Sequence, residues 1–210
     1  MHALFPGEAL SWGHVNLEAA ARRLGRLDEG PLPIPEQQAL VAKELKRIGV
    51  DAGYGGWLEN RNTLWRDTYL QEEEKWVHLG VDFYVPQGTL VASPFAARVI
   101  YVGEDPDTDG GWGTRILLQP RGQEPLMILG HLQWPSVEAG CVVQAGQQLG
   151  TVGEPARNGG WFPHLHVQAV SGPLAGAPMA TLLEIDGYGK LADLNKLALQ
   201  FPDPLPWLMR

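Results

Sequence analysis

Cysteine is almost absent from this sequence of 210 residues, and long apolar runs are missing as well. The single cysteine, Cys141, excludes a disulfide within the chain, and we expect it to be buried as a small apolar side chain. No stretch approaches the roughly 18 to 20 consecutive apolar residues that a membrane span requires. We therefore expect no membrane span.

Positive charge is also scarce, since 16 Lys and Arg stand against 24 Asp and Glu, for a formal net charge of −8 at pH 7. Such a surface repels phosphate backbones, so we expect no nucleic-acid partner. The first residues, from Met1 to Glu8, lack the cationic segment and apolar run of a secretory signal. This favours a cytoplasmic protein, with export by an unrecognised route as the alternative.

Helical signals are confined mainly to the first third of the chain. Asn16 can cap a helix over residues 17–27, and Pro35 suits the first turn of a second helix over 36–48. Gly49 follows the last turn of this second helix and favours its end there. Residues 1–75 are therefore predicted to form an N-terminal helical extension.

Beyond Trp76 the pattern changes to short apolar runs separated by turn residues, which is typical of β-strands. The expected strands cover residues 77–84, 90–92, 98–102, 114–118, 126–129, 142–143, 149–152 and 165–170. A Gly/Pro-rich segment and a short helix over 191–199 follow. The pattern predicts a mainly β protein with a compact, mostly antiparallel domain over 76–172 and a C-terminal tail over 173–210 that wraps it.

Four of the six histidines lie in the β region, together with one notable carboxylate. His164 and His166 would point to the same face of an extended strand, about 6.6 Å apart at about 3.3 Å per residue. Between His78 and Asp82 the chain must bend, because an extended segment would span about 13 Å. Gly80 is placed to allow that bend.

Imidazole nitrogen and carboxylate oxygen suit Zn²⁺, and catalytic zinc sites usually have three protein ligands. His78, Asp82, His131, His164 and His166 together exceed three. The spacing alone does not separate the metal ligands from acid/base groups beside the metal.

These residues resemble the LytM/lysostaphin-type metallopeptidases of peptidase family M23, whose pattern is His-x-x-x-Asp, a lone His, and His-x-His. The resemblance runs from about Trp76 to Val170 and includes His78-Leu79-Gly80-Val81-Asp82, Gly130-His131-Leu132 and Pro163-His164-Leu165-His166. It implies an antiparallel β-sheet with a groove and zinc-dependent hydrolysis of peptide bonds, usually in peptidoglycan cross-links.

Carried over position by position, the resemblance implies that His78, Asp82 and His166 bind Zn²⁺ and that His131 and His164 are catalytic. Which histidine acts as the general base stays open. The implied partner is a peptide or peptidoglycan-fragment substrate, and the oligomeric state is unknown.

The sequence departs from the family pattern at two places. Leu129 stands where the family commonly has a Tyr, and the bulky pair Trp161-Phe162 precedes His164 where small residues are usual. Trp112 and Trp161 can line the groove, although aromatic residues of a small β domain more often pack in the core. The segment Asn60-Arg61-Asn62 is interpreted as a solvated polar loop outside the site.

Two other functions remain open. One is a noncatalytic binding or activator module that uses the groove to hold a peptide or protein partner, and the other is an intracellular hydrolase of a different amide. Noncatalytic members of such a family typically lose ligands, whereas all five polar positions are present here. The sequence therefore favours the enzyme.

Overall fold

The computed structural model describes residues 3–7, 9–23, 32–65, 68, 70, 74–122 and 125–209. Within these ranges the strands are β1 (Trp12–His14), β2 (Ala52–Gly55), β3 (Val77–His78), β4 (Val81–Tyr84), β5 (Leu90–Ala92), β6 (Ala97–Glu104), β7 (Thr114–Pro120), β8 (Leu126–Gln133), β9 (Val142–Val143), β10 (Gln148–Val152), β11 (Leu165–Val170) and β12 (Tyr188–Gly189). The helices are α1 (Leu17–Arg23), α2 (Ile34–Ile48), α3 (Gly172–Ala175), α4 (Met179–Leu183), the 3₁₀ helix η2 (Leu191–Asp193), α5 (Leu194–Gln200) and α6 (Leu205–Leu208).

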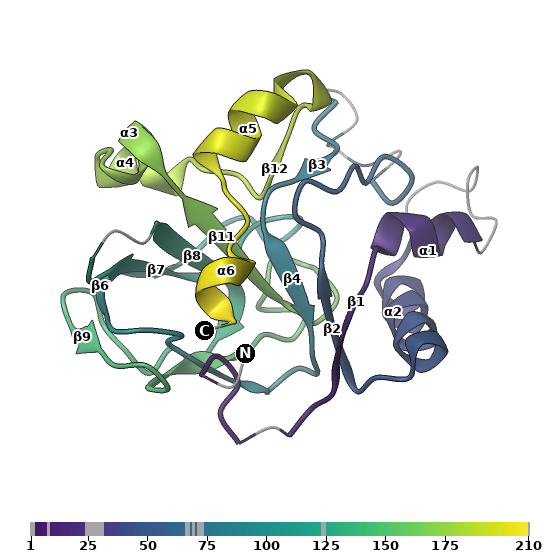
Figure 1. The fold of residues 1–210 in the computed structure, drawn as a ribbon, viewed down its shortest axis with the longest axis horizontal. Helices are drawn as coiled ribbons and strands as arrows, with labels where there is room; N and C mark the ends of the chain where they lie inside the picture. The colour runs from purple at the N-terminus through teal and green to yellow at the C-terminus, as the bar shows by residue number, and fades with distance from the viewer. Residues whose placement is uncertain are drawn as a thin grey trace.

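Most strands join one large sheet, in which β1, β2, β4, β11, β8, β7, β6 and β9 lie side by side in that order (Figure 1). Strand β10 pairs with β8 and with β5, which completes the sheet. The ladders are antiparallel apart from β1 with β2, which is parallel. The expected mainly β, mostly antiparallel architecture is confirmed.

All eight expected strand segments form strands, with ends that differ by a few residues. The segment 77–84 is divided into β3 and β4, and only β4 belongs to the large sheet, because β3 pairs with β12. This division is the bend that was expected between His78 and Asp82.

The N-terminal segment is not purely helical, because β1 and β2 extend the large sheet beside β4. Neither strand was predicted. Strand β1 has three residues and β2 has the sequence Ala-Gly-Tyr-Gly, so neither shows the alternation by which strands are recognised. Figure 1 shows α1 and α2 lying together next to these two strands. The division of the chain at residues 75 and 172 stays a prediction.

The predicted helix signals are largely confirmed. The Asn16 side chain accepts a hydrogen bond from the Ala19 amide at 2.6 Å, and α1 follows it to Arg23, while residues 24–27 lie outside the described ranges. Helix α2 has Pro35 in its first turn and ends at Gly49, whose φ of 74° is left-handed. The tail helix expected over 191–199 corresponds to η2 and α5.

Alternation along the central strands divides the sheet into two buried faces. Leu165, Val167 and Ala169 of β11 belong to one apolar cluster, together with Val81 and Phe83 of β4. The residues between them, which include Asp82, His166 and Gln168, are also buried but face the other way. The polar site therefore lies on the sheet face opposite the main apolar cluster.

Both ends of the chain pack on the main cluster, since Leu4, Phe5 and Leu208 belong to it. Cys141 packs against the same cluster but is only partly buried, so the expectation of a fully buried thiol is wrong. Its strand neighbours lie at the β9 edge of the sheet, where less of the chain covers them.

None of the helices in the described ranges combines the length and apolar character needed to cross a bilayer.

Candidate metal centre

Three buried side chains bring one donor atom each to a single point on the sheet. The Nε2 atom of His78 lies 3.0 Å from Nδ1 of His166 and 3.1 Å from Oδ1 of Asp82. The Nδ1 atom of His166 lies 3.0 Å from the same carboxylate oxygen. These separations approach the roughly 3.3 Å between donors that share a tetrahedral zinc at bond lengths of about 2.0 to 2.1 Å.

In His78 and His166, the ring nitrogen that points away from Asp82 determines the tautomer of the ring. His78 Nδ1 lies 2.9 Å from the Gly56 carbonyl oxygen, to which it can only donate. His166 Nε2 lies 3.1 Å from Gln168 Oε1, and the Gln168 amide nitrogen in turn donates to the Asp186 carbonyl at 3.2 Å. In the neutral state both imidazoles therefore direct lone pairs, without a proton, toward the Asp82 oxygen. Three lone pairs that converge in this way form a donor set suited to a cation.

Burial favours the neutral imidazoles that a metal needs. Burial lowers the pKa of His78 to about 3, and the positive charge of Arg61 acts in the same direction. Burial would by itself raise the pKa of Asp82, but His78 and Arg61 oppose it and hold this pKa well below its ordinary value. At neutral pH the group therefore presents the Asp82 carboxylate and the neutral His78 imidazole.

Two further imidazoles border the three donors. His164 Nδ1 donates to the Phe162 carbonyl at 2.7 Å, and His131 Nδ1 donates to the Asn158 carbonyl at 2.8 Å. Each ring therefore keeps a lone pair on Nε2, and His164 Nε2 lies 3.5 Å from Asp82 Oδ1. The two ring centres are 4.5 Å apart. Burial lowers the pKa of both side chains, so both are unprotonated and able to accept a proton.

His131 reaches this face through a β-bulge. Between Leu129 and Leu132, strand β8 has one more residue than the facing part of β7, where Ile116 and Thr114 are the partners. His131 itself has a φ of 62°, and its amide donates to the Trp112 carbonyl at 2.7 Å. Simple alternation would turn His131 away from His166, because Gly130 is the residue that pairs with His166. The bulge turns it back.

Gly80 is required at the bend for a reason other than the expected one. Its φ is not in the left-handed region, so backbone freedom does not explain this residue. A Cβ atom at this position would lie 2.4 Å from Nε2 of His166 and 2.7 Å from the Val167 carbonyl oxygen. Any other residue here would displace the His166 ring.

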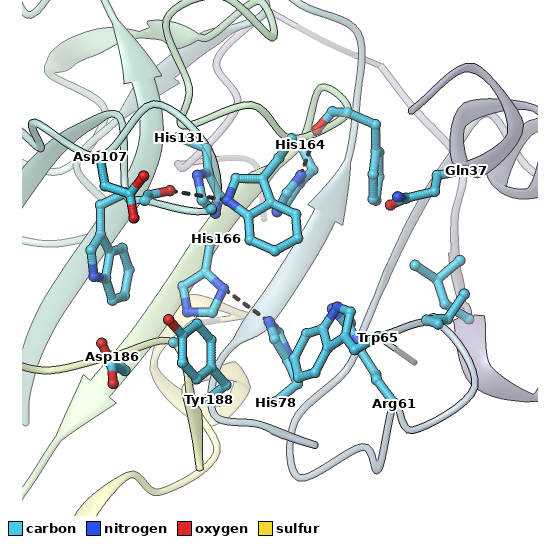
Figure 2. A pocket seen from close by; sticks show the side chains of 18 of the residues that line it. Gln37, Arg61, Trp65, His78, Asp107, His131, His164, His166, Asp186 and Tyr188 are labelled. Atoms are coloured by element: carbon cyan, nitrogen blue, oxygen red, sulfur yellow. Dashed lines mark hydrogen bonds between the residues drawn. The ribbon is translucent and has the colours of Figure 1, made fainter. Parts of the chain in front are cut away.

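The four histidines line a cavity of about 250 Å³ (Figure 2), and Asp82 lies buried beneath them. Figure 2 shows the four imidazoles converging, with Asp107 and Asp186 to one side and Gln37 and Trp65 to the other. Leu17, Leu40 and Leu64 of the N-terminal segment also line the cavity. The extension therefore builds one wall of the site.

Trp112 and Trp161 both line the cavity, as the groove interpretation required. Trp112 is also buried in an apolar cluster and stacks near His131, with ring centres 6.3 Å apart. Leu129, which replaces the Tyr common in the family, is fully buried in the main cluster instead of lining the cavity.

The interpretation of Asn60-Arg61-Asn62 as a solvated loop is wrong for Arg61. Its side chain is 5% exposed, lines the cavity, and places Nη2 2.8 Å from Oδ2 of Asp82. A carboxylate partner 21 positions away in the sequence left no local pattern, so only the fold shows this contact. Gly56, which orients the His78 imidazole, was missed for the same reason. Gln168, which orients His166, lies only two residues along the same strand, so strand alternation could have pointed to it.

The metal-free protein should become less stable as the pH falls from 7.5 to 5. Unfolded histidines titrate near pH 6.5, whereas burial keeps His78, His131 and His164 neutral below that pH in the folded state. Each histidine should therefore lower the free energy of unfolding by up to about 1.4 kcal/mol per pH unit below 6.5. Urea unfolding of chelator-treated protein measures this. His164→Ala should reduce the slope, and a stability that is constant or rises on acidification would contradict these pKa directions.

Comparison with known proteins gives a family match. The model of peptidase family M23 matches residues 76–176. A search of curated protein sequences gave no match. Among solved structures, the catalytic domain of the antimicrobial peptidase lysostaphin from Staphylococcus simulans is 24% identical, covering 64% of this chain and 81% of that one, with a TM-score of 0.44.

Two other solved structures show a similar level of likeness. LytU is 21% identical, covering 62% of this chain and 71% of its own, with a TM-score of 0.42. A zinc-containing peptidase from Vibrio cholerae is 29% identical, covering 44% of this chain and 26% of its own, with a TM-score of 0.37. The segment matched by the family model contains His78, Asp82, His131, His164 and His166. The segment over residues 76–176, which carries the whole match, is of the peptidase family M23 type.

Proposed function

We propose that this protein is a zinc-dependent metalloendopeptidase, with His78, Asp82 and His166 as the metal ligands and His131 and His164 as catalytic residues. The observation that carries the proposal is the convergence of three buried donor atoms within 3.0 to 3.1 Å of one another. Two imidazoles and one carboxylate form a donor set that zinc prefers in hydrolytic sites. Among the described residues, this is the group whose donor atoms lie close enough together to hold a metal ion.

A zinc ion bound there would supply Lewis acidity, which polarises a peptide carbonyl and lowers the pKa of water. The protein's own contribution is proton transfer and orientation. His131 and His164 each present an unprotonated Nε2 whose ring is fixed by a backbone carbonyl on the other side. One ring can take the proton of the attacking water and later donate it to the leaving amine. The other can donate to the oxygen that becomes negative during attack after its Nε2 has taken a proton from solvent.

The positions of these two histidines support an enzyme over a noncatalytic binding module. A module would need only the cavity walls, whereas here two further imidazoles are buried, fixed in one tautomer and placed 4.5 Å apart beside the metal ligands. The positive φ of His131 belongs to the bulge that turns its ring toward the cavity.

The proposed substrate is a peptide, with peptidoglycan-type cross-link peptides as the first class to test because the family resemblance implies them. The cavity offers aromatic walls from Trp65, Trp112 and Trp161, against which a peptide chain can pack. An amide outside cell walls remains the alternative substrate.

The purified protein should contain about one zinc per chain and should hydrolyse peptides only when zinc is present. Elemental analysis measures the metal, and mass spectrometry measures the products from soluble wall fragments and from a mixed peptide pool. Chelator-treated protein serves as the control, and added zinc should restore cleavage. A protein that binds zinc but cleaves neither pool would favour the noncatalytic module, and one that takes up no transition metal at equimolar zinc would refute the metal centre.

A further inference from the structure

The second oxygen of Asp82 forms a buried ion pair with a residue of the N-terminal segment, without a hydrogen bond of good geometry. While Oδ1 faces the two imidazoles, Oδ2 lies 2.8 Å from Nη2 of Arg61. The Asp82 side chain is fully buried and Arg61 is 5% exposed, so solvent does not screen this pair appreciably. The guanidinium therefore sets which carboxylate oxygen is presented to the other donors.

Arg61 is itself fixed by a second buried carboxylate. Its Nε donates to Glu59 Oε2 at 2.8 Å, and its guanidinium lies 5.5 Å from the centre of the Trp65 ring. The other Glu59 oxygen, Oε1, accepts a hydrogen bond from the Glu18 amide of α1 at 3.1 Å. A continuous buried chain thus runs from α1 through Glu59 and Arg61 to Asp82.

The packing around Arg61 leaves it little freedom. Gly56 follows β2, has a φ of 102°, and approaches so closely that a Cβ atom there would lie 2.3 Å from Arg61 Nη2. The same Cβ would lie 2.7 Å from Nδ1 of His78, the nitrogen that donates to the Gly56 carbonyl. The N-terminal segment therefore positions a metal-site histidine and Arg61 through one glycine.

We propose that Arg61 is a positioning residue for the metal centre, which holds Asp82 so that Oδ1 alone faces the ion, and that Glu59 and α1 hold Arg61 in place. The inference rests on the proposed metal centre. It assigns the N-terminal segment, which lies outside the family match of residues 76–176, a part in metal binding.

Positioning and simple charge predict opposite outcomes when Arg61 is removed. A positive charge beside the ion repels it, so a residue that acted only by charge would, when lost, let zinc bind more tightly. A residue that orients a ligand would, when lost, let zinc bind more weakly, by about 10- to 100-fold. The direction of the change in zinc affinity therefore distinguishes the two roles.

The experiment compares Arg61→Met with the unaltered protein by zinc titration against a competing chelator, with folding checked by circular dichroism. We expect zinc to bind about 10- to 100-fold more weakly to the variant. With Co²⁺ in place of zinc, we expect weaker visible absorption in Arg61→Met, because a freed Asp82 can bind through both oxygens and raise the coordination number. An affinity that is unchanged or higher, or an unchanged Co²⁺ spectrum, would overturn the proposal.

Two more conservative variants allow the same zinc-affinity test if Arg61→Met does not fold. Arg61→Lys retains the charge but has no planar fork to contact Asp82 and Glu59 together, and Glu59→Gln retains Arg61 but weakens its anchor. Both should bind zinc more weakly than the unaltered protein, and wild-type affinity in both would overturn the proposal.

Arg47→Met provides a matched control. It removes an ion pair of the same N-terminal segment, with Glu44 at 2.7 Å, away from the cavity. It should bind zinc normally, and an equal loss of affinity there would assign the effect to general destabilisation of the segment. If the unaltered protein bound no zinc, the proposed function would fail, whereas normal zinc binding by Arg61→Met would refute only the positioning role.

Discussion

Replacement of His166 by alanine should reduce the zinc content of the purified protein from about one ion per chain to almost none. The Nδ1 atom of His166 lies 3.0 Å from both His78 Nε2 and Asp82 Oδ1, so its removal leaves two donors, too few for tight binding. Elemental analysis and chelator competition measure the loss. Peptide cleavage should disappear with the metal.

His14→Ala is a suitable control for His166→Ala, because His14 is an exposed histidine of β1 outside the cavity. This variant should retain the zinc content and affinity of the unaltered protein. Stoichiometric zinc with unchanged affinity in His166→Ala would show that the metal, if present, lies elsewhere.

Replacement of His131 or His164 by alanine should leave the zinc content near that of the unaltered protein but lower peptide cleavage by about 100-fold or more. Both rings present Nε2 to the site, yet neither belongs to the group of three whose donor atoms converge. Metal content and cleavage are measured on the same preparations, so that lost metal and lost proton transfer are separated.

His164 gives the sharper form of this second test, because its Nε2 lies only 3.5 Å from Asp82 Oδ1. If His164→Ala lost its zinc, His164 would be a ligand and the roles of His164 and a neighbouring residue would have to be exchanged. If both variants kept full activity as well as zinc, neither histidine would be catalytic.

The spacing of polar residues along β-strands predicted much of the site. Two-residue alternation correctly brought His164 and His166 to the same cavity, and the distance along an extended chain correctly required a bend between His78 and Asp82. These predictions depend on local geometry, which the sequence carries directly. The assignment of the five residues to ligand and catalytic roles comes from the family resemblance and stays a proposal.

What could not be predicted depends on contacts between distant segments. The bulge that turns His131 toward the cavity arises from the register between β8 and β7, and no residue in the sequence marks it. Arg61 looked like an ordinary loop residue because its partner, Asp82, reaches it only after β2 pairs with β4. Gly80 was correctly identified as special, but the His166 ring, rather than the backbone angle, is what demands glycine.

Anomalous diffraction from crystals of the zinc-loaded protein, collected on both sides of the zinc absorption edge, tests the metal centre most directly. The structure predicts one zinc peak between His78 Nε2, Asp82 Oδ1 and His166 Nδ1, with Asp82 Oδ2 still on Arg61. A fully loaded crystal with its zinc peak away from these three atoms, or with zinc on His131 and His164 instead, would contradict the proposed site.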